Sequence, residues 1–480
     1  MIAEGRRKWY ALALICAVQF MVVLDIAIVN VALPSIQTDL GFSQENLQWV
    51  ISAYALVFGG FLLLGGRTAD LLGRRRIFIA GTILFTVGSL LCGLAWSEAS
   101  LIGARAIQGL GAATVSPAAL AILVTTFREG RERNIALGAW GAVGGAGAAA
   151  GVLLGGILTD LLSWEWIFFV NIPVGVIALV LSPILLTESR DARGQSFDAP
   201  GAVLVTAGLS LLVFGITEGR DWGWTSGTTI GVFAAVAALL VGFVVWELRT
   251  KDPLMPFSIF RLQTLAAANV AGFTLGTVLF AMFLMLTLYM QQVLGYSPLR
   301  TGLGYLAVAG TAIVWSALAA QLVTRIGVKP VLVAGMTFLT VGLLYFTQVD
   351  VGGSYLGDLL PGFLLVSIGM GFSFVPISIA ALAGVKDSEA GLASGLINTS
   401  QQIGGALGIA ALSAVATSTT KDALASGTPT PLALTDGFEA AFIGAAVIAA
   451  VGIVASLVLV RNRDLVLDEP VPALPVLDAP

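Results

Sequence analysis

The residue best placed to do chemistry is Asp25, which lies in the middle of an apolar stretch over residues 9–34. Such a stretch is long enough to cross a bilayer, and an ionised carboxyl group at that depth costs several kcal/mol. The surrounding run, AVQFMVVLDIAIVNVALP, contains no Lys or Arg that could neutralise the acid locally. Asp25 is therefore the first candidate for a proton carrier.

Arg105 is the partner that we expect for Asp25, because it is the only basic residue that we place inside an apolar segment. Gln108 follows at i+3 and shares its helix face. At about 1.5 Å per residue, Asp25 and Arg105 reach similar depths in two helices of opposite direction. Burial favours the protonated carboxyl group and a close Arg105 favours the ionised one, so movement of Arg105 would switch proton affinity. A purely structural ion pair is the alternative.

A second charged motif, GGRTADLLGRRR at 65–76, lies in a short link between two apolar segments. Gly73 permits a tight turn between Asp70 and Arg74. We predict a cytoplasmic gate in which Asp70 pairs with an Arg or with the positive N-terminus of a neighbouring helix, and separates from it during transport. Ordinary positive-inside charge is the alternative, and it explains the Arg residues but not Asp70.

Small and polar residues mark two further features. The segment 138–160 repeats glycine every four residues, and this stripe, with one adjoining glycine, predicts close helix packing by Gly147, Gly151, Gly155 and Gly156. We find no acid in the interior of an apolar segment in the second half of the chain, so polar and aromatic side chains are the candidates for a substrate cavity, although many will simply bridge helices. The cavity candidates are Asn30, Gln108, Asn269, Phe280, Phe283, Tyr289, Trp315, Asn398 and Gln402.

The composition is that of a membrane protein, with 57% hydrophobic and 11% charged residues among 480. The absence of His excludes His-based triads and HExxH zinc sites, and no GxxxxGK[ST] phosphate loop is present. We therefore expect no metal, no cofactor and no enzymatic activity. The net charge of −4 is distributed without a basic patch, so nucleic acid is not an expected partner.

Apolar runs of about 20 residues predict an all-α polytopic protein with fourteen transmembrane helices. The weakest of the fourteen is the seventh. Basic residues fall almost entirely in alternate links, which places both termini in the cytoplasm. The predicted spans are 10–34, 47–66, 77–96, 100–125, 135–158, 166–186, 200–217, 228–247, 264–290, 301–324, 331–349, 358–382, 393–416 and 437–460.

An internal repeat organises these spans. The segment 69–81 can be laid over 322–335, which aligns Gly73 with Gly327 and Gly81 with Gly335. Two six-helix halves with two inserted helices between them would explain this internal similarity. Such an arrangement is suited to a transporter. The predicted units are an N-terminal half at 1–190, two inserted helices at 191–262, a C-terminal half at 263–462 and a disordered cytoplasmic tail at 463–480.

These motifs together resemble the major facilitator superfamily, and within it the fourteen-span drug:proton antiporters. The resemblance implies the major facilitator fold, alternating access by rocking of two halves, Asp25 as proton carrier, Arg105 as its modulator and Asp70, Gly73 and Arg74 in the cytoplasmic gate. One departure is Val152, where the family's antiporter motif usually has Pro. The matching segments are LDIAIVNVALP (24–34), RTADLLGRRR (67–76), RAIQGLGAA (105–113), WEWIFFVNIPVG (164–175), YMQQVLGYSPLRTGL (289–303) and GLASGLINTSQQIGGALG (391–408).

The predicted function is proton-coupled multidrug efflux of hydrophobic or cationic compounds across the inner membrane of a bacterial-type cell. The expected partners are a small-molecule substrate, protons and the lipid bilayer, and we expect the protein to work as a monomer. A dedicated exporter of one endogenous metabolite or antibiotic is the first alternative, followed by a proton-coupled importer. A receptor or scaffold that transports nothing would explain the spans but not the sorted polar motifs.

Overall fold

A computed structural model shows an all-α protein and describes residues 4–127, 131–189, 198–251, 253–255, 257, 262–382, 385 and 390–460. These residues contain no β-strand. Twelve helices among them are long and apolar enough to cross a membrane. The predicted tail at 463–480 lies outside the described residues.

The first half consists of six long helices and two single-turn helices. Gly73 separates two of the long helices with φ +111°, a conformation that favours glycine, as the predicted tight turn requires. The elements are α1 (Glu4–Leu40), α2 (Gln44–Leu47), α3 (Trp49–Leu72), α4 (Arg74–Gly93), α5 (Glu98–Thr126), α6 (Arg131–Leu161), α7 (Trp166–Phe169) and α8 (Asn171–Leu185).

The rest of the chain forms an inserted helical pair and a second set of six long helices. The inserted pair is α9 (Ala199–Trp222) and α10 (Gly227–Arg249). The second set is α11 (Gln263–Leu288), α12 (Pro298–Ile326), α13 (Val328–Tyr345), α14 (Leu360–Leu382), α15 (Ala390–Ala425) and α16 (Thr430–Leu459), with the short π-helices η2 (Tyr289–Val293) and η4 (Tyr355–Leu359) and the 3₁₀ turn η3 (Phe346–Gln348).

Each predicted span corresponds to one long helix, except that the sixth is divided between α7 and α8. Twelve of these helices meet the requirements for a membrane span. In α3 and α6, the described residues provide shorter apolar stretches, Trp49–Leu62 and Ala150–Leu161. The total of fourteen crossings therefore stays a prediction.

The two sets of six helices pack in the same order. In the first, α1 packs against α6, and α5 packs against both α3 and α4. In the second, α11 packs against α15, and α14 packs against both α12 and α13. Gly327 separates α12 from α13 with φ +87°, in the same place that Gly73 holds between α3 and α4. This correspondence supports the repeat predicted from the similarity between segments 69–81 and 322–335.

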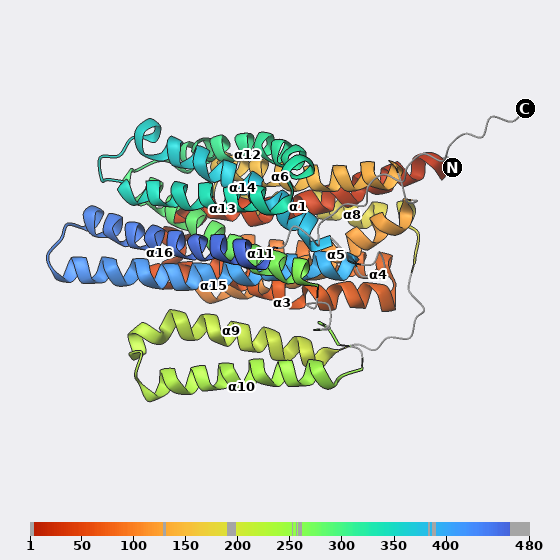
Figure 1. Ribbon diagram of the computed structural model, residues 1–480, viewed down its shortest axis with the longest axis horizontal. Helices are drawn as coiled ribbons and strands as arrows, with labels where there is room; N and C mark the ends of the chain where they lie inside the picture. Colours follow the sequence, from red (N-terminus) through yellow and green to blue (C-terminus); the bar gives the residue numbers. More distant parts are fainter. Residues whose placement is uncertain are drawn as a thin grey trace, which may run out of the picture.

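The halves meet along two seams, α3 against α15 and α6 against α12. The inserted helix α9 packs against both α3 and α15 and so covers the first seam (Figure 1). The start of α1 and the end of α16 lie at the same end of the bundle, which we call the terminal end. The opposite end, which holds the α15–α16 turn, is the far end.

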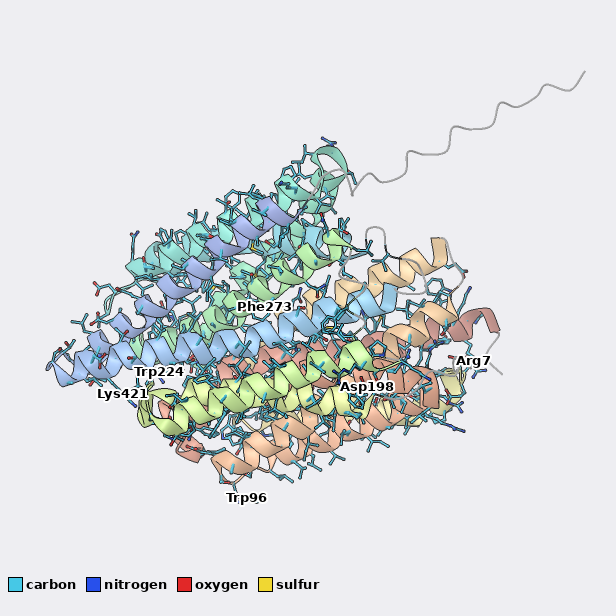
Figure 2. All side chains as sticks on the ribbon, turned by 60° about the horizontal axis from the view of Figure 1, so that its bottom comes forward. Arg7, Trp96, Asp198, Trp224, Phe273 and Lys421 are labelled. Carbon is cyan, nitrogen blue, oxygen red and sulfur yellow. The ribbon has the colours of Figure 1, made fainter. Side chains whose placement is uncertain are left out.

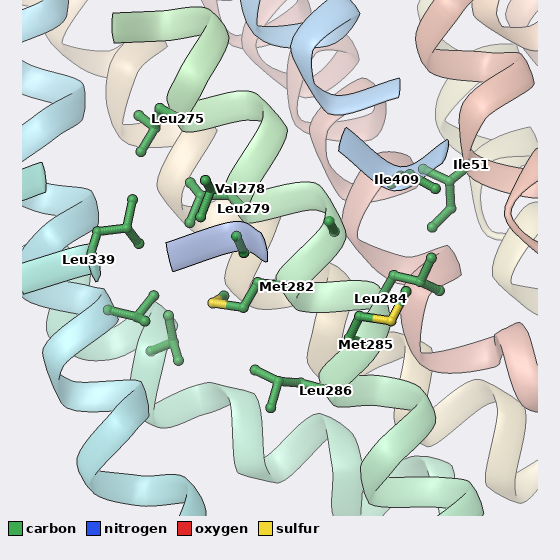
Figure 3. Packing of buried hydrophobic residues seen from close by; sticks show 14 of the residues in the cluster. Ile51, Leu275, Val278, Leu279, Met282, Leu284, Met285, Leu286, Leu339 and Ile409 are labelled. Carbon is green, nitrogen blue, oxygen red and sulfur yellow. The ribbon is translucent and has the colours of Figure 1, made fainter. Parts of the chain in front are cut away.

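The largest apolar cluster centres on α11, which contributes buried residues along its whole length. Figure 3 shows labelled side chains from α11, including Leu275 and Met282, within this cluster. The cluster also contains α1 residues such as Ile28 and Val29, so it joins the two halves. Apolar burial of this extent excludes water from the polar groups of neighbouring helices, which strengthens their electrostatic interactions.

Candidate functional site: a buried carboxylate network

Asp25 lies near the middle of α1 and is completely buried, with a relative exposure of 0%. Its Oδ2 atom accepts a hydrogen bond from Arg105 Nη1 at 2.7 Å, and Arg105 is 1% exposed. The sequence prediction that these two residues meet is therefore confirmed. Because a buried charge is costly unless it is paired and hydrogen-bonded, this geometry explains how the bundle tolerates the acid.

Two amides complete the coordination of the carboxylate. Asp25 Oδ1 accepts from Gln108 Nε2 at 2.8 Å and from Asn171 Nδ2 at 2.9 Å. Both amide nitrogens also donate to Ser89 Oγ, at 3.1 and 3.0 Å. Arg105 can only donate, so its 2.7 Å bond to Gln108 Oε1 requires the amide nitrogen of Gln108 to face Asp25.

Arg105 is held from α3 and α7 as well as by Asp25. Its Nε atom donates to Val50 O at 2.9 Å. The guanidinium carbon lies 4.3 Å from the ring centroid of Tyr54 and 5.7 Å from that of Phe168. Both rings are within the distance at which a cation is attracted to an aromatic face. The guanidinium group therefore has a defined position before any movement of the halves.

The arrangement can bind or release a proton at Asp25 only if it rearranges. All three groups on the carboxylate are N–H donors, so they stabilise the ionised form. A proton on either oxygen would be directed at a donor hydrogen, and at least one donor would have to move away. The site is thus suited to a two-state exchange between an ionised, paired carboxylate and a protonated, unpaired one.

Sequence reasoning identified Asp25, Arg105 and Gln108 but missed Ser89 and Asn171. Both are buried, and their side chains connect α4 and α8 to the acid. Asn171 does carry a signal, because it is an amide side chain near the start of an otherwise apolar span. Ser89 carries none, because a single hydroxyl group in a membrane helix commonly bonds to its own helix.

The predicted cytoplasmic gate lies at the terminal end, where α3 turns into α4. Asp70 belongs to the last turn of α3, and its side chain is outside the described part of the chain. Arg74 begins α4, and its backbone N–H donates to Ser189 O at 2.9 Å. The role of these residues as a gate stays a prediction.

Arg75 and Arg76, which follow Arg74 in α4, contact the C-terminal end of the first half and not the second half. Glu188, which follows α8, accepts a hydrogen bond from the Arg75 backbone N–H at 3.1 Å. The same carboxylate lies 3.8 Å from Arg75 Nε and 3.7 Å from Arg76 Nε. In this conformation the charged loop is therefore anchored within its own half.

The glycine stripe of α6 packs directly against α1. A Cβ atom at Gly151 would lie 2.7 Å from Leu24 O, and one at Gly155 would lie 2.7 Å from Ile28 O. Gly147 faces Val23 in the same way, at 3.1 Å. These positions bracket Asp25 in α1, so the close approach of α6 covers the helix that carries the acid.

Gly156 instead packs across the α6–α12 seam. A Cβ atom there would lie 2.7 Å from Pro298 O. On the facing helix, a Cβ atom at Gly302 would lie 2.7 Å from Val152 O. The two halves therefore approach at backbone distance at this seam, in a stretch where α6 has Val152 in place of a helix-bending Pro.

Apart from Gln108, the cavity candidates do not gather into one site. Asn269 accepts from Ser400 Oγ at 2.7 Å and so joins α11 to α15. The Tyr289 hydroxyl group donates to Asp350 O at 2.6 Å, close to the far end. Asn30 donates to Ile26 O at 3.1 Å, within α1.

The remaining candidates divide between packed aromatics and polar residues. Phe283 lies 5.3 Å from Tyr305 between ring centroids, and Trp315 lies 6.2 Å from Phe372. Phe280 is partly buried against the main cluster. The other two are both on α15. Asn398 is exposed, and Gln402 is buried, with no hydrogen-bond partner for its Nε2 atom among the described residues.

The far end is where the halves bond to each other. Gln291 Nε2 donates to Val31 O at 2.7 Å, and Gln292 Nε2 donates to Gln37 Oε1 at 2.8 Å. Both Gln residues belong to η2, and both acceptors belong to α1. From this end the ribbons of the two halves diverge toward the terminal end, where Figure 2 labels Arg7.

Known proteins agree with this architecture. The sequence profile of the Major Facilitator Superfamily matches residues 15–409. The puromycin resistance protein pur8 of Streptomyces alboniger is 41% identical over 434 residues, 90% of this chain and 86% of the relative. The cephamycin export protein CmcT of Amycolatopsis lactamdurans is 40% identical over 447 residues, with 91% and 89% covered. A bacterial homologue of the human lysosomal transporter Spinster, solved inward-facing and unoccupied, superposes with TM-score 0.65 at 16% identity, covering 97% of this chain and 99% of that one.

Two packed helical halves with a buried acid in the first define a polytopic membrane carrier. The chain belongs to the Major Facilitator Superfamily. It is a transporter and not an enzyme, and it is a multi-pass protein of the bacterial inner membrane. The predicted family and the all-α fold are confirmed.

Proposed function

We propose that this protein exports hydrophobic or cationic small molecules in exchange for protons, using Asp25 as the proton site. The observation that carries the proposal is the enclosure of the Asp25 carboxylate by Arg105, Gln108 and Asn171. A carboxylate of 0% exposure with three donors has no open position for a substrate in this conformation. This geometry favours proton exchange over direct substrate contact.

The direction of transport depends on which end of the bundle faces the cytoplasm. Basic residues such as Arg7, Arg75, Arg249 and Arg325 belong to the terminal end, and the positive-inside rule assigns that end to the cytoplasm. All fourteen long helices would then cross the membrane, with both termini inside. The hydrogen bonds of Gln291 and Gln292 join the halves at the far end, which supports the assignment of this conformation to a state open to the cytoplasm.

A proton cycle follows from this assignment. In the cytoplasm-open state the three donors hold Asp25 ionised, as expected after a proton has been released inward. As the halves rock, α1 would also shift against α3 and α5 within the first half, so that Arg105 withdraws from Asp25 while it keeps its bonds to Val50 O and Gln108 Oε1. The unpaired, buried carboxylate would then take up a proton from outside, which allows the return to the inward state.

The test is drug export into inside-out vesicles that are energised with a pH gradient. We expect Asp25→Asn to abolish gradient-driven transport, because the amide cannot exchange a proton. Asp39→Asn is the matched control, since Asp39 lies on the same helix but its carboxylate accepts from Trp164 Nε1 at 2.8 Å near the far end. Gradient-driven export by Asp25→Asn at the wild-type rate would refute the proton role of Asp25.

A dedicated exporter of one antibiotic is the second candidate, and the names of the relatives favour it. The resistance protein is named for puromycin and the export protein for cephamycin, one antibiotic each. A panel of structurally unrelated compounds in the same vesicles separates the two candidates. Transport of several unrelated compounds supports multidrug export, whereas transport of one chemical series supports the dedicated exporter.

A further inference from the structure

A cavity of about 250 Å³ lies between the two halves near the far end. The first half contributes only Leu47 and Gln48, at the junction of α2 and α3. The second half provides the rest of the wall, which is drawn from α11, α15 and α16. These residues are Leu284, Met285, Leu288, Ser413, Ala416, Thr417, Thr420, Lys421, Leu424, Leu434 and Phe438.

The chemistry of the wall defines the kind of molecule that it would take. Most of the wall is apolar, including Leu284 and Met285 of the α11 face shown in Figure 3. Ser413 is 6% exposed, and its Oγ atom has no hydrogen-bond partner among the residues that the structure describes. A buried hydroxyl group without a partner is unfavourable, so a ligand that hydrogen-bonds to it binds more tightly than one that does not.

The volume of the cavity and the charge of its wall restrict the kinds of ligand further. The volume is just below the range of about 300–1,000 Å³ that is typical of ligand pockets, so the ligand is a small one. Among the described residues of the wall, Lys421 is the only charged one, and Figure 2 shows it at the end where the halves converge. Its positive charge disfavours a cationic ligand.

The position of the cavity links ligand binding to conformation. Its wall includes both halves, and it lies at the end that Gln291 and Gln292 hold closed. When the far end opens, the Leu47–Gln48 wall must separate from α15. A ligand that binds only while the walls are together stabilises the closed far end by its binding free energy.

We propose that this cavity is a binding site for a small, neutral, largely apolar molecule with one hydrogen-bonding group, and that its occupation holds the carrier in the conformation with the far end closed. In the orientation proposed above, such a molecule enters from the outer face and inhibits transport. This proposal rests on the rocking of the halves in the proposed function, but not on proton exchange at Asp25.

The probe is 2-naphthol, whose binding to the purified full chain in detergent is followed by its fluorescence in the absence of a pH gradient. Naphthalene lacks the hydroxyl group and naphthylmethylammonium carries a positive charge. We expect 2-naphthol to bind about 3- to 10-fold tighter than naphthalene, as one hydrogen bond provides. The cation should bind weaker than 2-naphthol. Equal binding of all three compounds would overturn the proposal.

Variants locate the site. Ala416→Phe fills the cavity and should weaken 2-naphthol binding at least tenfold, whereas Val415→Phe changes a neighbouring residue that is 41% exposed and should leave binding unchanged. Ser413→Ala should reduce binding of 2-naphthol to the level of naphthalene and leave naphthalene unaffected. This conservative variant keeps the test decisive even if Ala416→Phe does not fold. Wild-type affinity in Ser413→Ala would refute the site.

A double variant tests the link to conformation. Gln291→Ala with Gln292→Ala removes the far-end bonds without changing the cavity wall, so 2-naphthol binding should weaken severalfold through the conformational equilibrium alone. Unchanged binding would refute the conformational part of the proposal. Because no proton gradient is present, failure here is distinct from failure of the Asp25→Asn transport test.

Discussion

At the scale of residues, the Asp25 carboxylate is completely buried and is coordinated by three side chains. It receives N–H donors from Arg105, Gln108 and Asn171, and each donor comes from α5 or α8. The desolvation cost of a buried charge is offset only while all of its hydrogen-bonding partners are present. Single substitutions in the network should therefore affect both stability and gradient-driven transport.

The first prediction concerns Asn171. Asn171→Leu keeps the volume but removes one donor to Asp25, and we expect a loss of about 1–3 kcal/mol in the free energy of unfolding. Because the carboxylate then loses one of the three groups that hold it in position, gradient-driven export should also fall. Thermal unfolding and vesicle export measure the two effects. Asn30→Leu is the control, since the Asn30 side chain donates to the Ile26 carbonyl of its own helix and, among the described residues, to no group of the network.

The second prediction concerns Tyr54, whose ring lies 4.3 Å from the guanidinium carbon of Arg105. The Tyr54 hydroxyl group has no hydrogen-bond partner in the described part of the chain, so Tyr54→Phe should retain stability and transport. Tyr54→Leu removes the aromatic face and should cost about 0.5–2 kcal/mol of stability and reduce coupled transport. If both variants behave alike in thermal unfolding and vesicle export, the ring does not position Arg105.

At the scale of elements, the structure depends on helices that approach at backbone distance. The stripe Gly147, Gly151 and Gly155 lets α6 lie directly on α1, on either side of Asp25. In a bilayer, association between helices comes mainly from packing and hydrogen bonds, because lipid is as apolar as the side chains. The stripe therefore stabilises the bundle where the acid must be kept from lipid.

The third prediction tests this contact. Gly151→Leu would place a Cβ atom 2.7 Å from Leu24 O and 2.8 Å from Ala27 Cβ, so α6 and α1 must separate. We expect a loss of several kcal/mol, seen as low expression and a lower midpoint of thermal unfolding. Ala146→Leu is the control, because Ala146 is an exposed residue of the same helix. Equal stability of the two variants would contradict the packing role.

At the scale of the whole molecule, the halves are joined by two seams and by two hydrogen bonds at the far end. The α3–α15 seam is covered by α9, which makes the inserted pair part of the interface and not an appendage. The far-end bonds involve neutral side chains, each worth about 0.5–1.5 kcal/mol net. Bonds of that strength can be exchanged during a transport cycle without a large barrier.

The fourth prediction is a shift of the conformational equilibrium. Gln291→Ala with Gln292→Ala should raise the ratio of molecules with an open far end to molecules with a closed one by about 5- to 150-fold, since two bonds together contribute about 1–3 kcal/mol. Spin labels at Thr38 and Arg300, exposed residues of α1 and α12, would report longer distances between them. An unchanged distance distribution would show that the seams alone hold the far end closed.

Hydropathy and charge alone determined which segments become helices and which residues are unusual. A segment that spans the membrane must be helical because lipid cannot satisfy backbone hydrogen bonds, and it needs about 20 apolar residues to cross the hydrocarbon core. Such segments can be recognised from the sequence alone. The same requirement makes Asp25 and Arg105 conspicuous. Glycine in the link after Asp70 likewise predicted the turn at Gly73, which has φ +111°.

Only the tertiary structure decided which donors surround Asp25 and where the halves touch. Asn171 is 146 positions from Asp25, and no periodicity connects them. The bond forms because α8 is placed beside α1 by packing, a property of the whole bundle. The same holds for Gln291 and Val31, which are 260 positions apart. Local sequence controls local hydrogen bonding and burial, whereas contacts between distant segments depend on how all the helices fill space together.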